Sequence, residues 1–66
     1  MIRIDINGEA REVAEGTVAT LLEELGLHPQ LIVVEYNREI LDRDKFDGTR
    51  LQAGDRLELV HFVGGG

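Results

Sequence analysis

The sequence of 66 residues contains neither cysteine nor serine. Without cysteine the chain has no disulfide, no thiolate ligand for zinc, no nucleophilic thiol and no residue on which a persulfide could form. Without serine it cannot build a serine-based catalytic triad. No apolar run approaches the roughly 18–20 residues of a membrane-spanning helix, and the first residues lack the pattern of a secretory signal. We therefore expect a cytoplasmic protein with no membrane contact.

Positive charge is also scarce, because seven basic residues stand against 13 acidic ones and leave a net charge of −6. Nucleic-acid binding depends first on basic side chains that neutralise phosphates, so we expect no nucleic-acid partner. The acidic segment 42–48 faintly resembles a calcium loop, but Phe46 and Ala53 stand where oxygen ligands belong. With His28 and His61 as the only histidines, we expect no metal site. Chains of this length rarely enclose a substrate cleft, so we expect no enzymatic activity.

The first half of the sequence predicts a hairpin followed by a helix. Isoleucines alternate with polar residues over 2–6, which is the pattern of a half-buried strand. The Asn-Gly pair at 7–8 favours a tight turn into a weaker edge strand over 9–13. Thr17 is a suitable N-cap, and apolar residues then recur at helical spacing over 18–25.

The second half predicts a strand over 31–36, a short strand over 39–41 and a last strand over 56–62, with Phe46 closing one end of the core. The resulting order of elements predicts an α+β fold of the β-grasp, ubiquitin-like type. We expect a mixed sheet of four or five strands with one long helix across one face. The predicted core is Ile4, Val18, Leu21, Leu22, Leu25, Ile32, Val34, Leu57 and Leu59.

Three glycines, Gly64-Gly65-Gly66, follow the last apolar strand. Glycine buries no apolar surface and loses the most entropy on ordering, so we expect a β-grasp domain over 1–63 and a flexible tail over 64–66. A tail without side chains could enter a narrow slot of another protein. Its carboxylate is ionised at neutral pH and is a poor electrophile, so a separate enzyme would have to activate it. An inert, frayed end is the alternative.

The last strand suggests a docking surface beside this tail. If Leu57 and Leu59 face the helix, the alternation of a strand points Glu58, Val60 and Phe62 outward. Single exposed apolar residues are common on protein surfaces. Two of them next to a functional terminus are better explained as a patch that binds a partner.

Several segments resemble the ThiS family of sulfur carriers in thiamine biosynthesis. They are the turn Asn37-Arg38-Glu39-Ile40, the turn Gly54-Asp55 and the ending from Val60 to Gly66. The resemblance covers essentially the whole chain, and the length fits the family. A Gly-Gly ending by itself is shared by ubiquitin-like proteins in general, so the fuller ending carries more weight.

The resemblance implies a mechanism in which Gly66 bears the reactive carboxylate, while Gly64 and Gly65 form a slim lead. An adenylating enzyme related to the ubiquitin-activating enzymes would activate the carboxylate with ATP. A sulfur donor such as a cysteine desulfurase would convert it to a thiocarboxylate, and thiazole synthase would receive the sulfur. The chain itself would bind no cofactor.

Three other readings remain open at this point. The small subunit of molybdopterin synthase carries sulfur by the same chemistry, but is usually longer. A ubiquitin-like modifier that is joined to lysines is a second alternative. A non-catalytic interaction module with an inert tail is the third.

Overall fold

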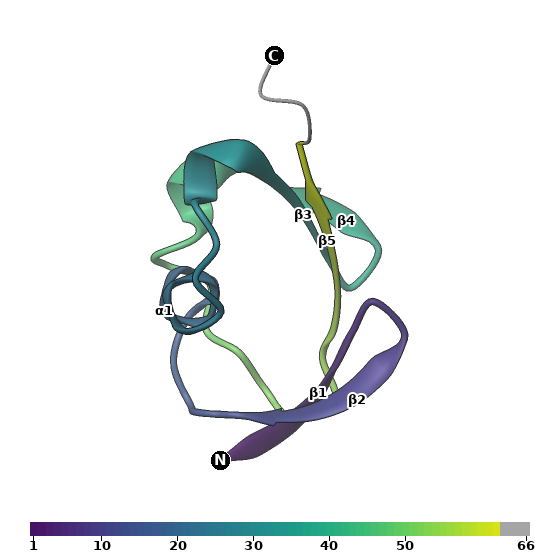
Figure 1. The fold of residues 1–66 in the computed structure, drawn as a ribbon. Coiled ribbons are helices and arrows are strands. Elements are labelled where there is room, and N and C mark those ends of the chain that lie inside the picture. Colours follow the sequence, from purple (N-terminus) through teal and green to yellow (C-terminus); the bar gives the residue numbers. More distant parts are fainter. Residues whose placement is uncertain (63–66) are drawn as a thin grey trace.

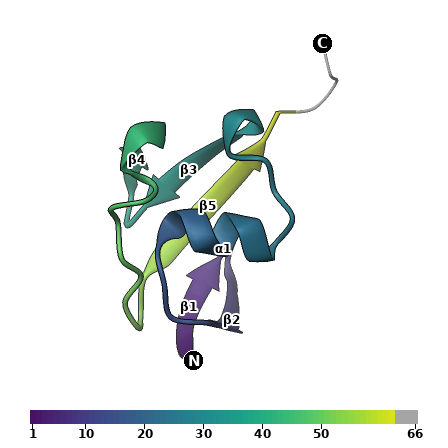
Figure 2. The same cartoon turned by 90° about the vertical axis from the view of Figure 1, so that its left-hand side faces the viewer.

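The computed structural model describes residues 1–62. In this range five strands form one sheet in the order β2-β1-β5-β3-β4, and one α-helix covers one face of the sheet (Figures 1 and 2). The elements are β1 (Ile2–Ile6), β2 (Glu9–Val13), α1 (Val18–Glu24), β3 (Ile32–Tyr36), β4 (Glu39–Leu41) and β5 (Arg56–His61), with the short 3-10 helices η1 (Pro29–Leu31) and η2 (Arg43–Lys45) in the connections. This arrangement confirms the predicted α+β fold of the β-grasp type.

The last strand of the sequence lies in the middle of the sheet. β5 runs parallel to β1 on one side and antiparallel to β3 on the other. Each of these neighbours pairs outward with its own hairpin partner, so β2 and β4 form the two edges. The position of β2 confirms the predicted edge strand. β5 is therefore supported from both sides at Arg56 and Leu57, while β3 continues to pair with it as far as His61.

Both hairpins turn through two residues with positive φ. The values are 52° at Asn7 and 86° at Gly8 in the first turn, and 50° at Asn37 and 74° at Arg38 in the second. Positive φ at both central positions defines the type I′ turn, whose twist matches that of the flanking strands. The two tight turns predicted from the sequence are thus confirmed, although the second has arginine where the first has glycine.

Helix α1 begins where the sequence predicted and is shorter than the long helix expected. The Thr17 hydroxyl accepts a hydrogen bond from the Thr20 backbone N–H at 3.2 Å, and the Thr20 hydroxyl oxygen accepts one from the Thr17 N–H at 2.9 Å. This reciprocal capping satisfies two free donors of the first turn. At the other end Gly26, with φ of 73°, follows the C-cap Leu25. The left-handed glycine stops the helix after seven residues.

The hydrophobic core lies between α1 and the inner face of the sheet, the face that the helix covers. Its buried members are Ile4, Ile6, Val13, Val18, Leu21, Leu22, Ile32, Val34, Phe46, Leu51 and Leu57. Burial of Phe46 confirms its predicted place in the core. Leu25 and Leu59 were predicted in the core but are only partly buried, because they line an open hollow at one end of the helix.

Two strand boundaries differ from the prediction. Leu31 belongs to η1 and not to β3, because Pro29 begins a 3-10 turn there. β5 ends at His61, one residue before the predicted Phe62. The Phe62 N–H nevertheless donates to the Leu31 carbonyl at 2.8 Å, so the bonding between the two segments continues one residue beyond the strand. Within residues 1–62, no helix combines the length and the apolar character needed to cross a membrane.

Candidate functional site

The end of β5 exposes apolar side chains on the outer face of the sheet, the face turned away from α1. Leu57 is fully buried beneath the helix, so the alternating residues Glu58, Val60 and Phe62 lie on the other face. Val60 and Phe62 keep 58% and 55% of their surface exposed. The outward orientation predicted for these three residues is therefore confirmed.

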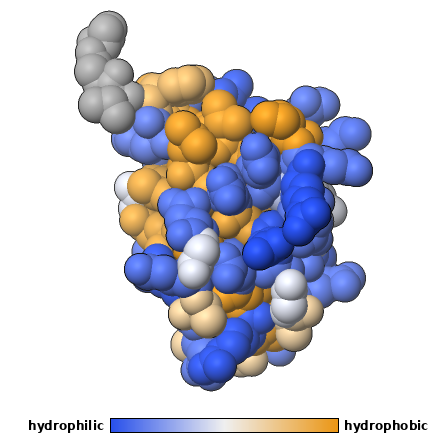
Figure 3. All heavy atoms as spheres, turned by 90° about the vertical axis from the view of Figure 1, so that its right-hand side faces the viewer, coloured by the Kyte–Doolittle hydropathy of each residue, from blue (hydrophilic) through white to orange (hydrophobic). Residues whose placement is uncertain are grey.

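Neighbouring strands extend this exposed surface. Val33 lies directly opposite Val60 in the pairing of β3 with β5, and Ile40 on β4 is 66% exposed. We call Val33, Ile40, Val60 and Phe62 together the apolar patch. Figure 3 shows hydrophobic side chains gathered on the outer face at the end where β5 finishes, next to a largely hydrophilic middle. Exposed apolar groups that are gathered in this way are typical of protein-binding surfaces.

The side chain of Asn7 holds β5 where β1 comes to an end. Its carbonyl oxygen accepts a hydrogen bond from the Leu59 N–H at 2.8 Å, and its amide donates to the Leu59 carbonyl at 3.3 Å. The Asn7 backbone N–H donates to the Leu57 carbonyl at 2.9 Å. These bonds extend the support of β5 past the last residue of β1. Sequence reasoning assigned Asn7 to a turn and missed this second role, which depends on a residue 52 positions away.

The sequence predicts that Gly66 bears the reactive carboxylate and that Gly64 and Gly65 lead to it. These three glycines lie outside the described residues. Of the predicted partner-binding residues, Glu58 and Val60 lie on β5, the strand that precedes the glycines in the sequence, and Phe62 directly follows it. β3 pairs with β5 as far as His61, and the Phe62 N–H donates to the Leu31 carbonyl at 2.8 Å, so this part of the candidate site is held from the β3 side.

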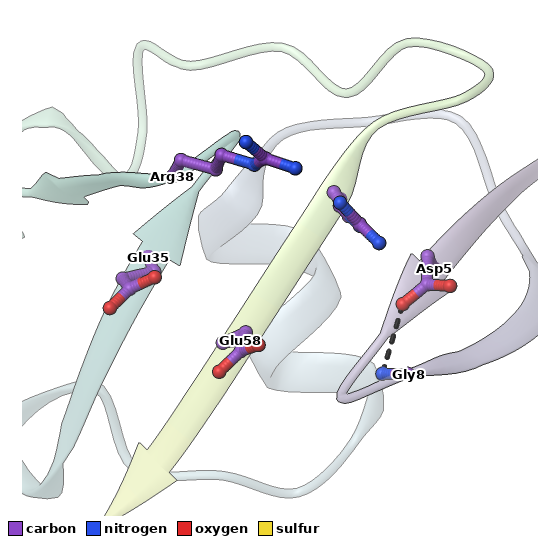
Figure 4. Close-up of a pocket in the computed structure, with 6 residues that line it drawn as sticks. Asp5, Gly8, Glu35, Arg38 and Glu58 are labelled. Atoms are coloured by element: carbon purple, nitrogen blue, oxygen red, sulfur yellow. Dashed lines mark hydrogen bonds between the residues drawn. The ribbon is translucent and has the colours of Figure 1, made fainter.

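A charged hollow of about 190 Å³ lies on the outer face beside the apolar patch. Its lining residues are Asp5, Gly8, Glu35, Arg38, Arg56 and Glu58. Figure 4 shows Glu35 and Glu58 side by side on β3 and β5, with the Arg38 side chain reaching from the turn after β3 toward β5. One hydrogen bond to a side chain joins members of this group, from the Gly8 N–H to the Asp5 carboxylate at 2.9 Å. The two glutamates face each other directly across the strand pair, an arrangement that is repulsive for like charges.

The start of β5 is held by a buried carboxylate. Asp55 is only 7% exposed and accepts hydrogen bonds from the Tyr36 hydroxyl at 2.6 Å, the Gln52 N–H at 2.7 Å and the Asn37 side-chain amide at 3.2 Å. Burial, then the hydrogen bond and the negative charge of Asp55, raises the pKa of Tyr36 to about 12. These contacts tie the turn before β5 to the end of β3. The sequence marked Asp55 only as a turn residue, since spacing does not show a partner 19 positions away.

A second hollow, of about 420 Å³, opens beside the end of β5 on the inner side, where Leu25, Leu59 and His61 are among its lining residues. His61 is exposed and pairs with Ile32 across the sheet. No group of three potential metal-ligating side chains occurs in the part of the chain that the structure describes.

A mixed sheet with its last strand in the centre, one helix across it and an apolar patch at the end of that strand defines a ubiquitin-like β-grasp protein. The model of the ThiS family matches residues 4–66, nearly the full length. The chain belongs to the ThiS family.

Individual relatives agree with this assignment. The chain is similar to the sulfur carrier protein ThiS of Bacillus subtilis, with 39% identity over 51 residues and 77% of each chain covered. A crystal structure of a thiamine biosynthesis protein (ThiS) from Geobacter metallireducens matches with a TM-score of 0.84 and 33% identity, covering 98% of this chain and 100% of the other. A thiazole synthase of Magnetococcus marinus is 38% identical over 66 residues. The chain covers only 20% of that protein, so it spans about a fifth of its length.

Proposed function

We propose that this protein is a sulfur carrier of thiamine biosynthesis and supplies the sulfur of the thiazole ring. The observation that carries the proposal is the family match, which runs from residue 4 through the glycine segment to Gly66. The match favours the thiamine pathway over the small subunit of molybdopterin synthase. It also favours an active glycine tail over an inert one.

In the proposed chemistry Gly66 bears the carboxylate that is activated. A carboxylate oxygen attacks the α-phosphorus of ATP in an adenylating enzyme, and pyrophosphate leaves. The terminal sulfur of a persulfide, supplied by a donor such as a cysteine desulfurase, then attacks the carbonyl carbon and displaces AMP. A thiol reduces the resulting acyl disulfide, which leaves Gly66 as a thiocarboxylate. The chain needs no cofactor of its own, because ATP is bound and used by the partner.

The absence of cysteine is consistent with this mechanism, in which other proteins activate the carboxylate and supply the sulfur. Any persulfide must be formed on another protein, since the chain offers no thiol. Sulfur can then be held only as the thiocarboxylate. We place these reactions in the cytoplasm.

The outer face at the end of β5 is the proposed contact with the partners. Val60 and Phe62 would pack against apolar groups of the adenylating enzyme, and Glu58 would lie at the margin of this contact. Their position supports the proposal, because Val60 pairs with Val33 of β3 and the Phe62 N–H bonds to the Leu31 carbonyl, and a fixed base limits the space that Gly66 must sample to reach the reacting groups. Placement within about 1 Å can decide the rate of such a reaction.

Thiazole synthase is the proposed acceptor of the sulfur. The thiazole synthase of Magnetococcus marinus contains a region that is similar to this whole chain. A carrier segment within the same polypeptide would meet its acceptor at high effective concentration. For the present chain we propose the same pairing.

Mass spectrometry of the intact chain tests the proposal. The 66-residue protein is incubated with the adenylating enzyme, ATP and the sulfur donor, and replacement of one terminal oxygen by sulfur is expected. A variant with one residue added after Gly66 should gain no sulfur, because the carboxylate is displaced from the reacting position. Deletion of Gly66 shortens the reach by about 3.3–3.6 Å and should cause a severe loss of rate.

Two controls make the experiment decisive. Circular dichroism should show that both variants remain folded, and omission of ATP should prevent sulfur incorporation into the unaltered chain. If the extended variant gains sulfur as readily as the unaltered chain, or if the unaltered chain never gains it, the sulfur-carrier proposal is wrong.

A further inference from the structure

The turn between β3 and β4 contains an arginine in a conformation that favours glycine. Arg38 has φ of 74°, in the left-handed region, where the corresponding residue of the other type I′ turn is Gly8 at 86°. Residues with a β-carbon are strained in this region. Backbone strain of this kind is often found at residues that serve a function, so the contacts of the Arg38 side chain are informative.

Arg38 does not serve the fold through its guanidinium group. Its side chain is exposed and reaches over the outer face toward β5, where it lines the charged hollow together with Arg56 (Figure 4). Within residues 1–62 neither guanidinium group forms a hydrogen bond or an ion pair. Two arginines on one hollow are thus left without internal partners.

Three carboxylates share the hollow with these arginines, but within residues 1–62 none of them forms an ion pair with either guanidinium group. Asp5 lies opposite Arg56 in the pairing of β1 with β5, and one oxygen of its carboxylate accepts a hydrogen bond from the Gly8 N–H at 2.9 Å. Glu35 and Glu58 face each other two residues further along β5, toward the apolar patch. Along β5 the outer face therefore changes from basic at Arg56, through acidic at Glu58, to apolar at Val60. This order gives the surface a direction, so a complementary partner can bind it in only one orientation.

We propose that Arg38 and Arg56 bind a carboxylate of thiazole synthase when that enzyme docks on the outer face. The proposal rests on the sulfur-carrier function proposed above and adds a contact that orients the acceptor enzyme. The planar fork of an arginine side chain binds a carboxylate through two parallel hydrogen bonds, which provides geometric specificity as well as affinity.

The position of this contact would allow it to orient β5 on the enzyme. Arg56 is the first residue of β5 and Phe62 directly follows its last one, so at about 3.3 Å per residue the two contacts lie roughly 20 Å apart. Two anchors at this separation would fix the axis of β5 relative to the enzyme. The end of the strand, and Gly66 beyond it in the sequence, would then be directed to one place on the acceptor.

Replacement of Arg38 by glycine separates this role from a structural one. Glycine is the favoured residue at this φ, so Arg38→Gly should unfold at the same or a higher temperature than the unaltered protein. Its affinity for thiazole synthase should nevertheless fall by roughly 10- to 100-fold, the loss expected for a hydrogen bond to a charged group. Arg56→Gln should weaken binding similarly, and both variants should show a smaller decrease in affinity with salt. Lys45→Gln removes the same charge away from the hollow and should bind as the unaltered chain does.

Calorimetric titration against a separately expressed thiazole synthase gives the affinities, and intact-mass analysis of sulfur loading is run on the same proteins. If both arginine variants bind with unaltered affinity and salt dependence while loading proceeds normally, the docking role is wrong and the sulfur-carrier function stands. An equal loss of affinity in Lys45→Gln would assign the effect to net charge and would also overturn it. If the unaltered chain neither gains sulfur nor binds thiazole synthase, the proposed function and this inference fail together.

Discussion

The hydrogen bond between Tyr36 and Asp55 offers a direct test of how the start of β5 is held. The Tyr36 hydroxyl donates to the buried Asp55 carboxylate at 2.6 Å. Tyr36→Phe removes this hydroxyl but leaves the Gln52 and Asn37 donors, at 2.7 and 3.2 Å, in place. A hydrogen bond to a charged group contributes about 1.5–3 kcal/mol. Because two donors still satisfy the carboxylate, we expect a loss near the lower end, about 1.5 kcal/mol in the free energy of unfolding.

The pH dependence of the protein's stability provides a second, independent test of the same hydrogen bond. The pKa of Tyr36 is raised by burial, and then by the hydrogen bond and charge of Asp55, from 10.0 to about 12. The folded protein therefore holds the phenolic proton more tightly than the unfolded chain does. This contribution to stability is complete below pH 10 and is lost as the pH rises toward 12. The stability difference between the unaltered protein and Tyr36→Phe should shrink across that window.

Urea unfolding followed by circular dichroism, at neutral pH and in steps through the alkaline window, measures both effects. Tyr36 is the only tyrosine of the chain, so tyrosinate absorbance reports the ionisation of this side chain alone. Tyr36→Phe is the matched control for all other groups that titrate in the same range. Equal stability of the two proteins at neutral pH, or tyrosinate formation centred near pH 10, would refute the role assigned to this hydrogen bond.

Three further changes test other parts of the structure. Leu22→Ala removes a side chain that is 1% exposed and should lower the free energy of unfolding by about 2–5 kcal/mol in urea titration, whereas an unchanged midpoint would place Leu22 outside the core. Phe62→Asp should leave stability unchanged but weaken calorimetrically measured binding to the adenylating enzyme, because the new charge must be desolvated in the contact; unaltered affinity would exclude the patch. Asn7→Gly keeps the turn and loses the bonds to Leu59, so it should cost about 1 kcal/mol and speed hydrogen exchange of the Leu59 amide. Unchanged exchange would contradict that role.

Features set by neighbours in the sequence could be predicted from the sequence alone. Alternation along β5 correctly separated the buried Leu57 from the exposed Val60 and Phe62. The N-cap Thr17 and the glycine at position 26 marked the two ends of α1. Each of these signals arises within a few residues, where backbone conformation and side-chain period are decided.

Other features depend on contacts between distant segments. The Asn7 bonds to Leu59 span 52 positions, and the bond from Tyr36 to Asp55 spans 19. Arg38 and Arg56 meet on one hollow only because β5 pairs with β3 in a particular register. The hydrophobic period and the composition of the sequence do not specify the register between two strands, since any sheet with the same alternation satisfies them.

The sequence by itself thus determined the order of the elements, the faces of the strands and the family of the protein. The tertiary structure alone decided that β5 lies between β1 and β3, that a buried carboxylate holds its start, and that two arginines, whose guanidinium groups have no partner among residues 1–62, share its outer face with the apolar patch. The physical reason is that local spacing specifies which face a side chain takes, while strand pairing and packing specify which distant side chains it meets.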